Sequence, residues 1–116
     1  PANARQRGEE LVSGLHALAE RHAIIGHVRR KGLRTALELV QDRDTRTPFP
    51  SATAMNSLLT MEAAKQGLII YPRRPINGLQ GDHVLIAPPL IVSSEQIEEI
   101  VRRLDTALDT VGGKRK

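Results

Sequence analysis

The stretch Val28–Val40, VRRKGLRTALELV, decides the fold because its second half alternates with a period of two. Leucine or threonine occupies every second position, and charged or smaller residues fill the positions between them. This alternation is typical of a β-strand that turns one face to a core. Gly32 interrupts the run, and a glycine inside a strand pattern commonly marks a bulge or a bend. We therefore expect two short strands or one bent strand.

Two amphipathic segments with helical spacing lie outward from this stretch. On the N-terminal side, residues 3–21 carry leucines on one face and charges on the other, which predicts a helix. On the C-terminal side, Ser93 and Gln96 form a capping box before the most regular apolar stripe in the chain. We expect Gly112 and Gly113 to stop that second helix.

The outer face of the C-terminal helix carries two glutamate–arginine pairs four residues apart. They are Glu98 with Arg102 and Glu99 with Arg103. Each pair has the favourable order and is worth about 0.2 to 0.5 kcal/mol. We expect these charges to be ordinary surface chemistry of a helix.

A third helix is expected in the middle of the chain. Residues 41–50 lack an apolar stripe and contain prolines, so they are expected to form a surface loop. Ser51 or Thr53 can cap the helix that follows, and Gly67 stands where a left-handed C-terminal residue is needed.

Two further short apolar runs, residues 68–71 and 84–87, predict strands that pair antiparallel. The order is then helix, strand, strand, helix, strand, strand, helix. It predicts an α/β chain of the α+β, two-layer kind. We expect a small, mainly antiparallel sheet of three to four strands, covered by about three helices.

Composition limits the classes of protein to consider. The 116 residues suit one domain. Aromatic residues make up only 2%, so the stacking platforms of single-stranded nucleic-acid binders are absent. Lysine and arginine outnumber aspartate and glutamate by 17 to 13, a small and dispersed excess that argues against a nucleic-acid partner. With no cysteine, no signal segment and no apolar run that could span a bilayer, we expect a cytoplasmic protein and no membrane partner.

The residue pattern alone gives little evidence of a reaction. The histidines lack metal-ligand spacing backed by carboxylates, and no serine lies in a nucleophile elbow. A Schiff-base enzyme needs one amine held in a cofactor pocket, and no lysine here has that setting. The histidines are His16, His22, His27 and His83, and the lysines are Lys31, Lys65, Lys114 and Lys116.

Four stretches, in the same order, resemble the class III aminotransferases. Their order, their spacing and the helix that follows make the combination specific, and together they cover nearly the whole chain. They are Asn3–Leu11 (NARQRGEEL), Val28–Val40, Gly67–Pro72 (GLIIYP) and Gly81–Val92 (GDHVLIAPPLIV). The resemblance implies that residues 1–112 are the C-terminal small domain of a fold type I enzyme, with residues 113–116 as a basic tail.

The resemblance also implies an activity and a set of partners. Enzymes of this family use pyridoxal phosphate to move an amino group between an amine or amino acid and a keto acid. A separate large domain supplies the cofactor lysine and the phosphate contacts, and the parent enzyme is usually a homodimer. We therefore expect this chain alone to bind no pyridoxal phosphate and to be inactive. We also expect an exposed apolar patch where the large domain docks.

The resemblance further implies where a substrate carboxylate binds. Some members carry an arginine two residues before the Ala-Pro-Pro-Leu run, where this chain has Leu85. Others place a mobile arginine after the GLI-like strand, where Arg73 is the nearest match and Arg74 is a rival. We expect Arg73 in a mobile loop rather than in a sheet, because nearby prolines and glycines hinder pairing. Pro88 and Pro89 are expected to form a stiff turn near the substrate entrance.

Two questions stay open at the level of sequence. Transaminases, semialdehyde aminomutases and dialkylglycine decarboxylases share this region, so neither the amine donor nor the acceptor, pyruvate or 2-oxoglutarate, is specified. The alternative to an enzyme fragment is a free-standing, non-catalytic binding or interaction module with the same fold. The reading frame upstream of Pro1 separates these two hypotheses.

Overall fold

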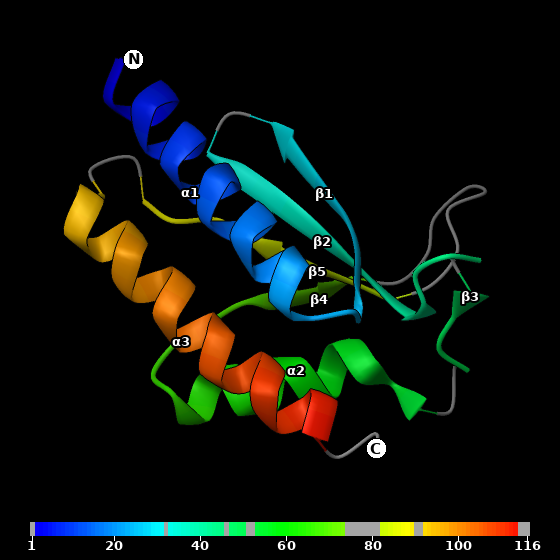
Figure 1. Ribbon diagram of the computed structural model, residues 1–116. Coiled ribbons are helices and arrows are strands. Elements are labelled where there is room, and N and C mark those ends of the chain that lie inside the picture. Colours follow the sequence, from blue (N-terminus) through cyan, green and yellow to red (C-terminus); the bar gives the residue numbers. More distant parts are fainter. Residues whose placement is uncertain are drawn as a thin grey trace.

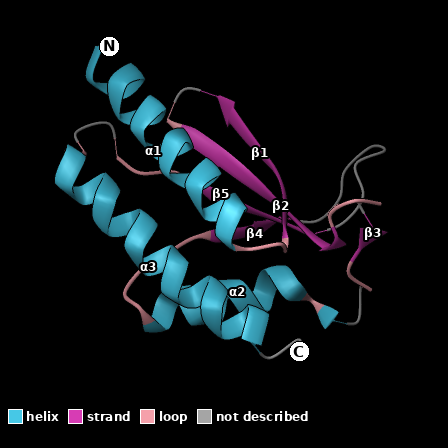
Figure 2. Ribbon diagram, viewed as in Figure 1, coloured by secondary structure: helices cyan, strands magenta, loops and turns pink. Residues whose placement is uncertain are grey.

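In the described part of the chain, three helices pack on one face of a small antiparallel sheet (Figure 1, Figure 2). This arrangement comes from a computed structural model that describes residues 2–31, 33–45, 47–50, 53–73, 82–89 and 92–113. The helix α3 packs against both of the others and so occupies the middle of the helical layer. The helices are α1 (Ala2–Arg21), α2 (Met55–Lys65) and α3 (Ser94–Gly113).

The sheet confirms the predicted fold class and is slightly larger than expected. Its strands are β1 (Ile25–Lys31), β2 (Arg34–Asp42), β3 (Thr47–Pro48), β4 (Tyr71–Arg73) and β5 (Asp82–Ile86). Their order is β1-β2-β5-β4, with β3 paired to β2. Every pairing among these described strands is antiparallel. The fifth strand, β3, accounts for the difference from the expected three to four.

The alternation in the first quoted stretch is confirmed by burial. Leu37 and Leu39 of β2 are completely buried in the core, whereas Ala36 and Glu38 point to the opposite face of the sheet and are half-buried. Because successive side chains of a strand point to opposite faces, the sheet has one face under the helices and one open face.

The same stretch forms two strands, β1 and β2, and the bulge in this pair lies at Gly26. The pairing register shifts between Ile25 and His27. A Cβ atom on Gly26 would lie 2.6 Å from Cγ1 of Val40, so a side chain would force the two strands apart. The bulge or bend expected at Gly32 lies outside the described residues.

The core fills the space between the sheet and the helices. It is built almost entirely from aliphatic side chains, as the low aromatic content requires. The helices α1 and α3 approach closely, since a Cβ atom on Gly14 would lie 2.7 Å from Cγ2 of Val101. The largest fully buried side chains include Leu11, Leu15, Ile25, Leu37, Leu39, Met55, Leu59, Ile70, Leu104 and Leu108.

The predicted capping box of α3 is confirmed. The backbone N–H of Gln96 donates to Oγ of Ser93 over 3.2 Å, and the N–H of Ser93 donates to Oε1 of Gln96 over 2.9 Å. At the other end α3 runs through Gly112 and ends at Gly113, so the helix stops within the predicted glycine pair.

One of the two predicted ion pairs on α3 is confirmed. Arg103 lies 3.2 Å from Glu99, four residues earlier, as expected. Arg102 also pairs with Glu99, three residues earlier, rather than with Glu98. Residues three and four apart both lie on one helix face, so a single carboxylate can serve both guanidinium groups.

The start of α2 differs from the prediction. Its N-cap is Ala54, in the left-handed region with φ of 49°, and neither Ala54 nor Thr53 provides a side-chain cap. Instead, Oδ1 of Asn56 accepts from the N–H of Ser57 over 2.8 Å and satisfies one free amide of the first turn. Ser51, the other expected cap, lies outside the described residues.

The left-handed glycine after α2 is confirmed, and it explains a second difference. Gly67 has φ of 79°, and the N–H of Leu68 then donates to the carbonyl oxygen of Ala63 over 2.9 Å. Because Leu68 still belongs to this helix end, strand pairing begins only at Tyr71 and not at residue 68.

The expected loop at residues 41–50 is also partly wrong. β2 continues to Asp42, and the short strand β3 follows it. Val40 pairs with Pro48, and Phe49 is buried in the core.

Candidate functional site on the open face of the sheet

Arg73 lies at the end of β4, an edge strand, and not in a mobile loop as predicted. Its backbone pairs with His83, and Tyr71 pairs with Leu85. The prediction failed because Pro72 does not prevent pairing at this place. Proline has no backbone N–H to donate. An edge strand tolerates a proline where the missing N–H would point away from the sheet.

The backbone at Arg73 is held from the helical side. Nδ2 of Asn56, at the start of α2, donates to the carbonyl oxygen of Arg73 over 3.0 Å. The side chain of Arg73 is exposed, and its guanidinium carbon lies 5.9 Å from the centre of the Tyr71 ring, within reach of a cation–π contact. Its Nη1 donates to the carbonyl oxygen of Pro72 over 3.1 Å. No carboxylate among the described residues pairs with Arg73, so its charge is available to an anion.

Tyr71, Arg73, His83 and Leu85 share the open face. Residues directly opposite each other in an antiparallel pair lie on the same face, as do alternate residues of one strand. Arg73 and Leu85 are therefore diagonal neighbours, about 7 to 8 Å apart between Cα atoms. These are the two positions at which the family resemblance places a carboxylate-binding arginine, and the fold brings both to one small area.

The structure does not bring Arg73 together with the proline turn. Pro88 and Pro89 follow the end of β5 that lies away from His83, the partner of Arg73. Five residues of extended chain from His83 to Pro88 span about 16 Å. The carbonyl oxygen of Pro89 accepts from the N–H of Val92 over 3.1 Å, so the turn leads directly into α3. Arg74 lies outside the described residues.

An apolar surface surrounds this site. Ile69 is 73% exposed and Tyr71 is 45% exposed, whereas Ile70 between them is buried. This alternation places Ile69 on the same face as Tyr71 and the half-buried Leu85. We name these three residues, Ile69, Tyr71 and Leu85, the open-face patch. A groove of about 820 Å³ between α1 and α3 and a cavity of about 330 Å³ beside His22 are lined by other residues, on the helical side.

The described residues do not fit a complete site for pyridoxal phosphate. Lys65 lies at the end of α2, its side chain is 63% exposed, and it pairs with Glu62 over 3.1 Å. It lines neither of the two hollows. Ser93 and Gln96 already occupy the N-terminus of α3 with their capping box. Lys31 lies in β1, and Lys114 and Lys116 lie outside the described residues.

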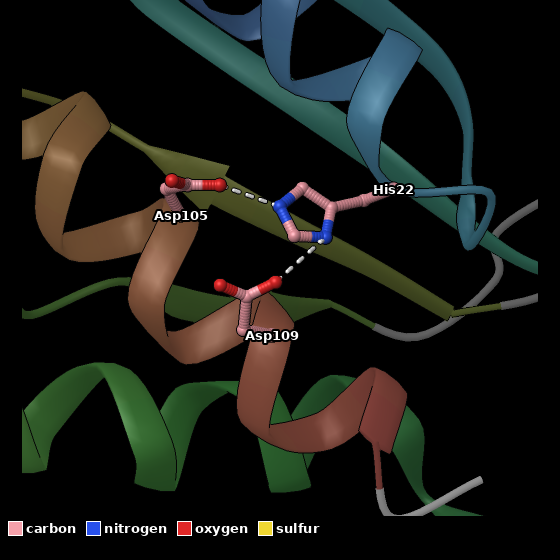
Figure 3. Close-up of side chains that lie close together, drawn as sticks. All are labelled: His22, Asp105 and Asp109. Carbon is pink, nitrogen blue, oxygen red and sulfur yellow. Dashed lines mark hydrogen bonds and ion pairs between the residues drawn. The ribbon is translucent and has the colours of Figure 1, made fainter. Parts of the chain in front are cut away.

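Sequence reasoning missed a second group of polar residues on the helical side. Figure 3 shows His22, directly after α1, between Asp105 and Asp109 of α3. The histidine lies more than eighty positions from either aspartate in the chain, so local spacing could not reveal the group. The available signal was the pair of aspartates four residues apart on one face of a predicted helix.

Comparison with known proteins identifies the family. The profile of the family described as aminotransferase class-III matches residues 1–108. The taurine–pyruvate aminotransferase of Rhodobacter capsulatus is 43% identical over 107 residues, which are 91% of this chain and 23% of that protein. An uncharacterised aminotransferase of Schizosaccharomyces pombe is 37% identical over 106 residues, 90% of this chain and 23% of that protein.

A solved structure agrees with the sequence relatives. An amine transaminase from an uncultivated Pseudomonas species, in its PLP-bound internal aldimine form, superposes with a TM-score of 0.83 and 33% identity. The match covers 97% of this chain and 24% of that one. This chain belongs to the class III aminotransferase family, whose members depend on pyridoxal phosphate. It spans about a quarter of the length of the relatives it matches, and none of its described helices is long and apolar enough to cross a membrane.

Proposed function

We propose that this chain is the C-terminal small domain of a class III aminotransferase that moves an amino group between an amine or amino acid and a keto acid. The observation that carries the proposal is the family match over residues 1–108, combined with coverage of only about a quarter of each relative. Such a domain supplies surface and substrate contacts, while the larger remainder of the enzyme supplies the cofactor lysine. In the complete enzyme, pyridoxal phosphate provides the electron sink for amino-group transfer.

The open-face patch is the surface that we assign to contact with the remainder of the enzyme. Ile69 and Tyr71 are large apolar side chains with 73% and 45% exposure in this chain, and they lie beside Leu85 on a sheet face that no described helix covers. Exposed apolar groups that gather on one face mark a contact surface. The chain should therefore tend to self-associate through this face when the remainder is absent.

Arg73 is the residue that we assign to the carboxylate of a substrate. Its guanidinium group has no described carboxylate partner and lies at the end of β4, next to the patch. A guanidinium group can bind a carboxylate through two parallel hydrogen bonds, and it can swing aside for an uncharged amine because the side chain is long. In this proposal only the side chain of Arg73 moves, because its backbone is paired in the sheet. The proline turn at Pro88 and Pro89 is proposed to border the substrate entrance at the other end of β5.

The Arg73 proposal is tested in the full-length enzyme. Replacing Arg73 with Ala should raise the barrier for a carboxylate-bearing substrate by about 1.5 to 3 kcal/mol, the worth of a charge-assisted contact. An uncharged amine should be little affected, and Arg74→Ala is the matched control that should have a much smaller effect. Equal losses for both substrate types, or a larger effect at Arg74, would assign the role elsewhere.

The domain assignment is tested separately. If it is correct, the reading frame continues upstream of Pro1, the whole protein is about four times as long as this chain, and the added part contains a cofactor lysine. The 116-residue chain incubated with pyridoxal phosphate should show no Schiff-base absorbance that borohydride fixes onto Lys31 or Lys65. A start codon at this point of the gene would favour the free-standing, non-catalytic module.

A further inference from the structure

We propose that His22, Asp105 and Asp109 form a binding site for a divalent transition-metal ion of the zinc type (Figure 3). One ligand atom from each of the three side chains lies within 4.8 Å of the other two. Asp105 and Asp109 are four residues apart, so both carboxylates project from the same face of α3 toward the end of α1. Imidazole nitrogen and carboxylate oxygen are ligands that zinc takes in proteins.

The imidazole of His22 is held in one orientation. Its side chain is 7% exposed, and Nε2 lies 2.6 Å from Oδ1 of Asp105. An ionised carboxylate can only accept, so Nε2 carries a hydrogen and donates it. In the neutral ring, Nδ1 then presents its lone pair on the side of Asp109. Proteins use this carboxylate–histidine arrangement to orient a metal-binding histidine.

The gap between His22 and Asp109 is slightly wider than a metal bridge. Nδ1 of His22 lies 3.9 Å from Oδ1 of Asp109, which is too long for a hydrogen bond. Two bonds of about 2.0 to 2.2 Å at the tetrahedral angle of zinc hold their ligand atoms about 3.3 to 3.6 Å apart, so the exposed Asp109 carboxylate would move about 0.5 Å toward the ion. The hydrogen bond described for the ring is made by Nε2, so Nδ1 is left to face this gap.

Asp105 and Asp109 have different parts in this site. Oδ1 of Asp105 already lies 3.3 Å from Nε of Arg21 as well as close to His22, so Asp105 acts as the outer partner that positions the ring. Asp109 is 63% exposed and is the carboxylate that binds the ion directly. The adjoining cavity of about 330 Å³ is lined by His22, Asp109 and Gly112, among others, and has room for the water ligands that complete the coordination.

The backbone at His22 is fixed before any ion binds. Its carbonyl oxygen accepts from the N–H of Ile25 over 3.1 Å and from Nη2 of Arg43 over 2.8 Å. This double anchoring holds the ligand in place, so that binding requires little ordering of the chain. The site would join the end of α1 to α3, and it is independent of any role in amino-group transfer.

The test is a calorimetric titration of zinc chloride into the 116-residue chain, with three variants alongside. The expected result is one ion per chain, with binding weakened at least about tenfold in Asp109→Asn. Loss of an outer partner typically weakens metal binding by about 10- to 100-fold, and Asp105→Asn should fall in that range. Glu98→Gln removes one exposed charge from the same helix and should bind zinc as the wild type does.

Nitrogen NMR of the histidines identifies the binding atom. Addition of zinc should shift Nδ1 of His22 and leave the signals of His16, His27 and His83 in place. Wild-type affinity in Asp109→Asn would overturn the proposal, as would coordination through Nε2 instead of Nδ1 or through another histidine. Absence of zinc binding in the wild type would overturn the proposal and leave the cluster as a structural contact between His22 and the two aspartates. Asp109 is on the helix surface, so its variant keeps the test valid even if Asp105→Asn does not fold.

Discussion

Nη2 of Arg43 donates a hydrogen bond of 2.8 Å to the carbonyl oxygen of His22, the residue that follows α1. The same guanidinium group donates to the carbonyl oxygen of Ala19 and, over 3.1 Å, to that of Ile25. The last carbonyl groups of a helix have no partner within it, and a positive charge near them is favourable. Arg43, just after β2, therefore fixes the end of α1 and its turn into β1.

Replacing Arg43 with Ala should lower the free energy of unfolding by about 1.5 to 3 kcal/mol, because it removes charge-assisted hydrogen bonds to three carbonyl groups. Arg43→Lys should restore only part of the loss, since an ammonium group lacks the planar fork that reaches several acceptors. Urea denaturation of both variants measures the effect. Equal stability of Arg43→Ala and the wild type would mean that water replaces these contacts without cost.

Replacing Ser93 with Ala should destabilise the chain by about 1 kcal/mol through loss of the N-terminal cap of α3. Ser13→Ala is the matched control, because Ser13 is exposed within α1 and its removal should change stability by less than about 0.5 kcal/mol. If the two residues of the capping box act as a unit, the double variant Ser93→Ala with Gln96→Ala should lose less stability than the sum of the losses in the two single variants. Strict additivity in chemical denaturation would contradict that coupling.

Gly67→Ala should destabilise the chain by about 1 kcal/mol or more, because φ at this position is 79° and a Cβ atom would lie 2.6 Å from Nη1 of Arg103. That nitrogen donates to the carbonyl oxygen of Gly67 over 3.1 Å and would have to move. Gly112→Ala is the contrasting control, since a Cβ atom there meets nothing within 4 Å. It should raise helix stability by up to about 1 kcal/mol. Thermal unfolding of the two variants should shift in opposite directions.

The ion pairs of Glu99 predict a dependence of stability on pH. Burial acts to raise the pKa of Glu99, but the hydrogen bonds and positive charges of Arg102 and Arg103 outweigh it and hold the pKa below its ordinary value of 4.5. A carboxyl group with a lowered pKa in the folded state contributes stability above its unfolded pKa. That contribution is lost as the pH falls through the folded pKa.

Glu99→Gln should therefore be less stable than the wild type at neutral pH, and the difference should vanish in strong acid. Thermal unfolding across this range measures it, with Glu98→Gln as the control that shows no such trend. A difference that stays constant with pH would mean that packing, and not charge, is responsible.

Sequence patterns specified the elements of this fold wherever the signal was local. The period-two alternation around Leu37 and the capping box at Ser93 both depend on neighbours a few residues away, and both are confirmed. The boundaries that failed depend on which of several local hydrogen bonds the folded chain makes, and residue type alone does not decide that. The predicted cap of α2 was wrong because the Asn56 side chain accepts from the first turn instead. The predicted start of the strand was wrong because Leu68 still bonds to the end of α2, so pairing begins at Tyr71.

The two candidate sites differ in the same way. The family resemblance selected Arg73, but its place in β4 follows from pairing with β5, which proline content alone argued against. The group at His22 joins segments more than eighty residues apart, so no motif could reveal it. The twofold use of Asp105, by Arg21 and by His22, is likewise visible only once α1 and α3 are packed together.

Pro72 and the arginines of β1 have a consequence for how copies of this chain can meet. In the described sheet, β1 and β4 lie at the two ends of the strand order β1-β2-β5-β4, and an exposed edge can template the addition of a strand from another molecule. On β4, Pro72 has no N–H to offer an incoming strand. On β1, Arg29 and Arg30 are both exposed and would place like charges against each other in an edge-to-edge pair. Cross-β aggregation is thereby disfavoured at β1 and at β4.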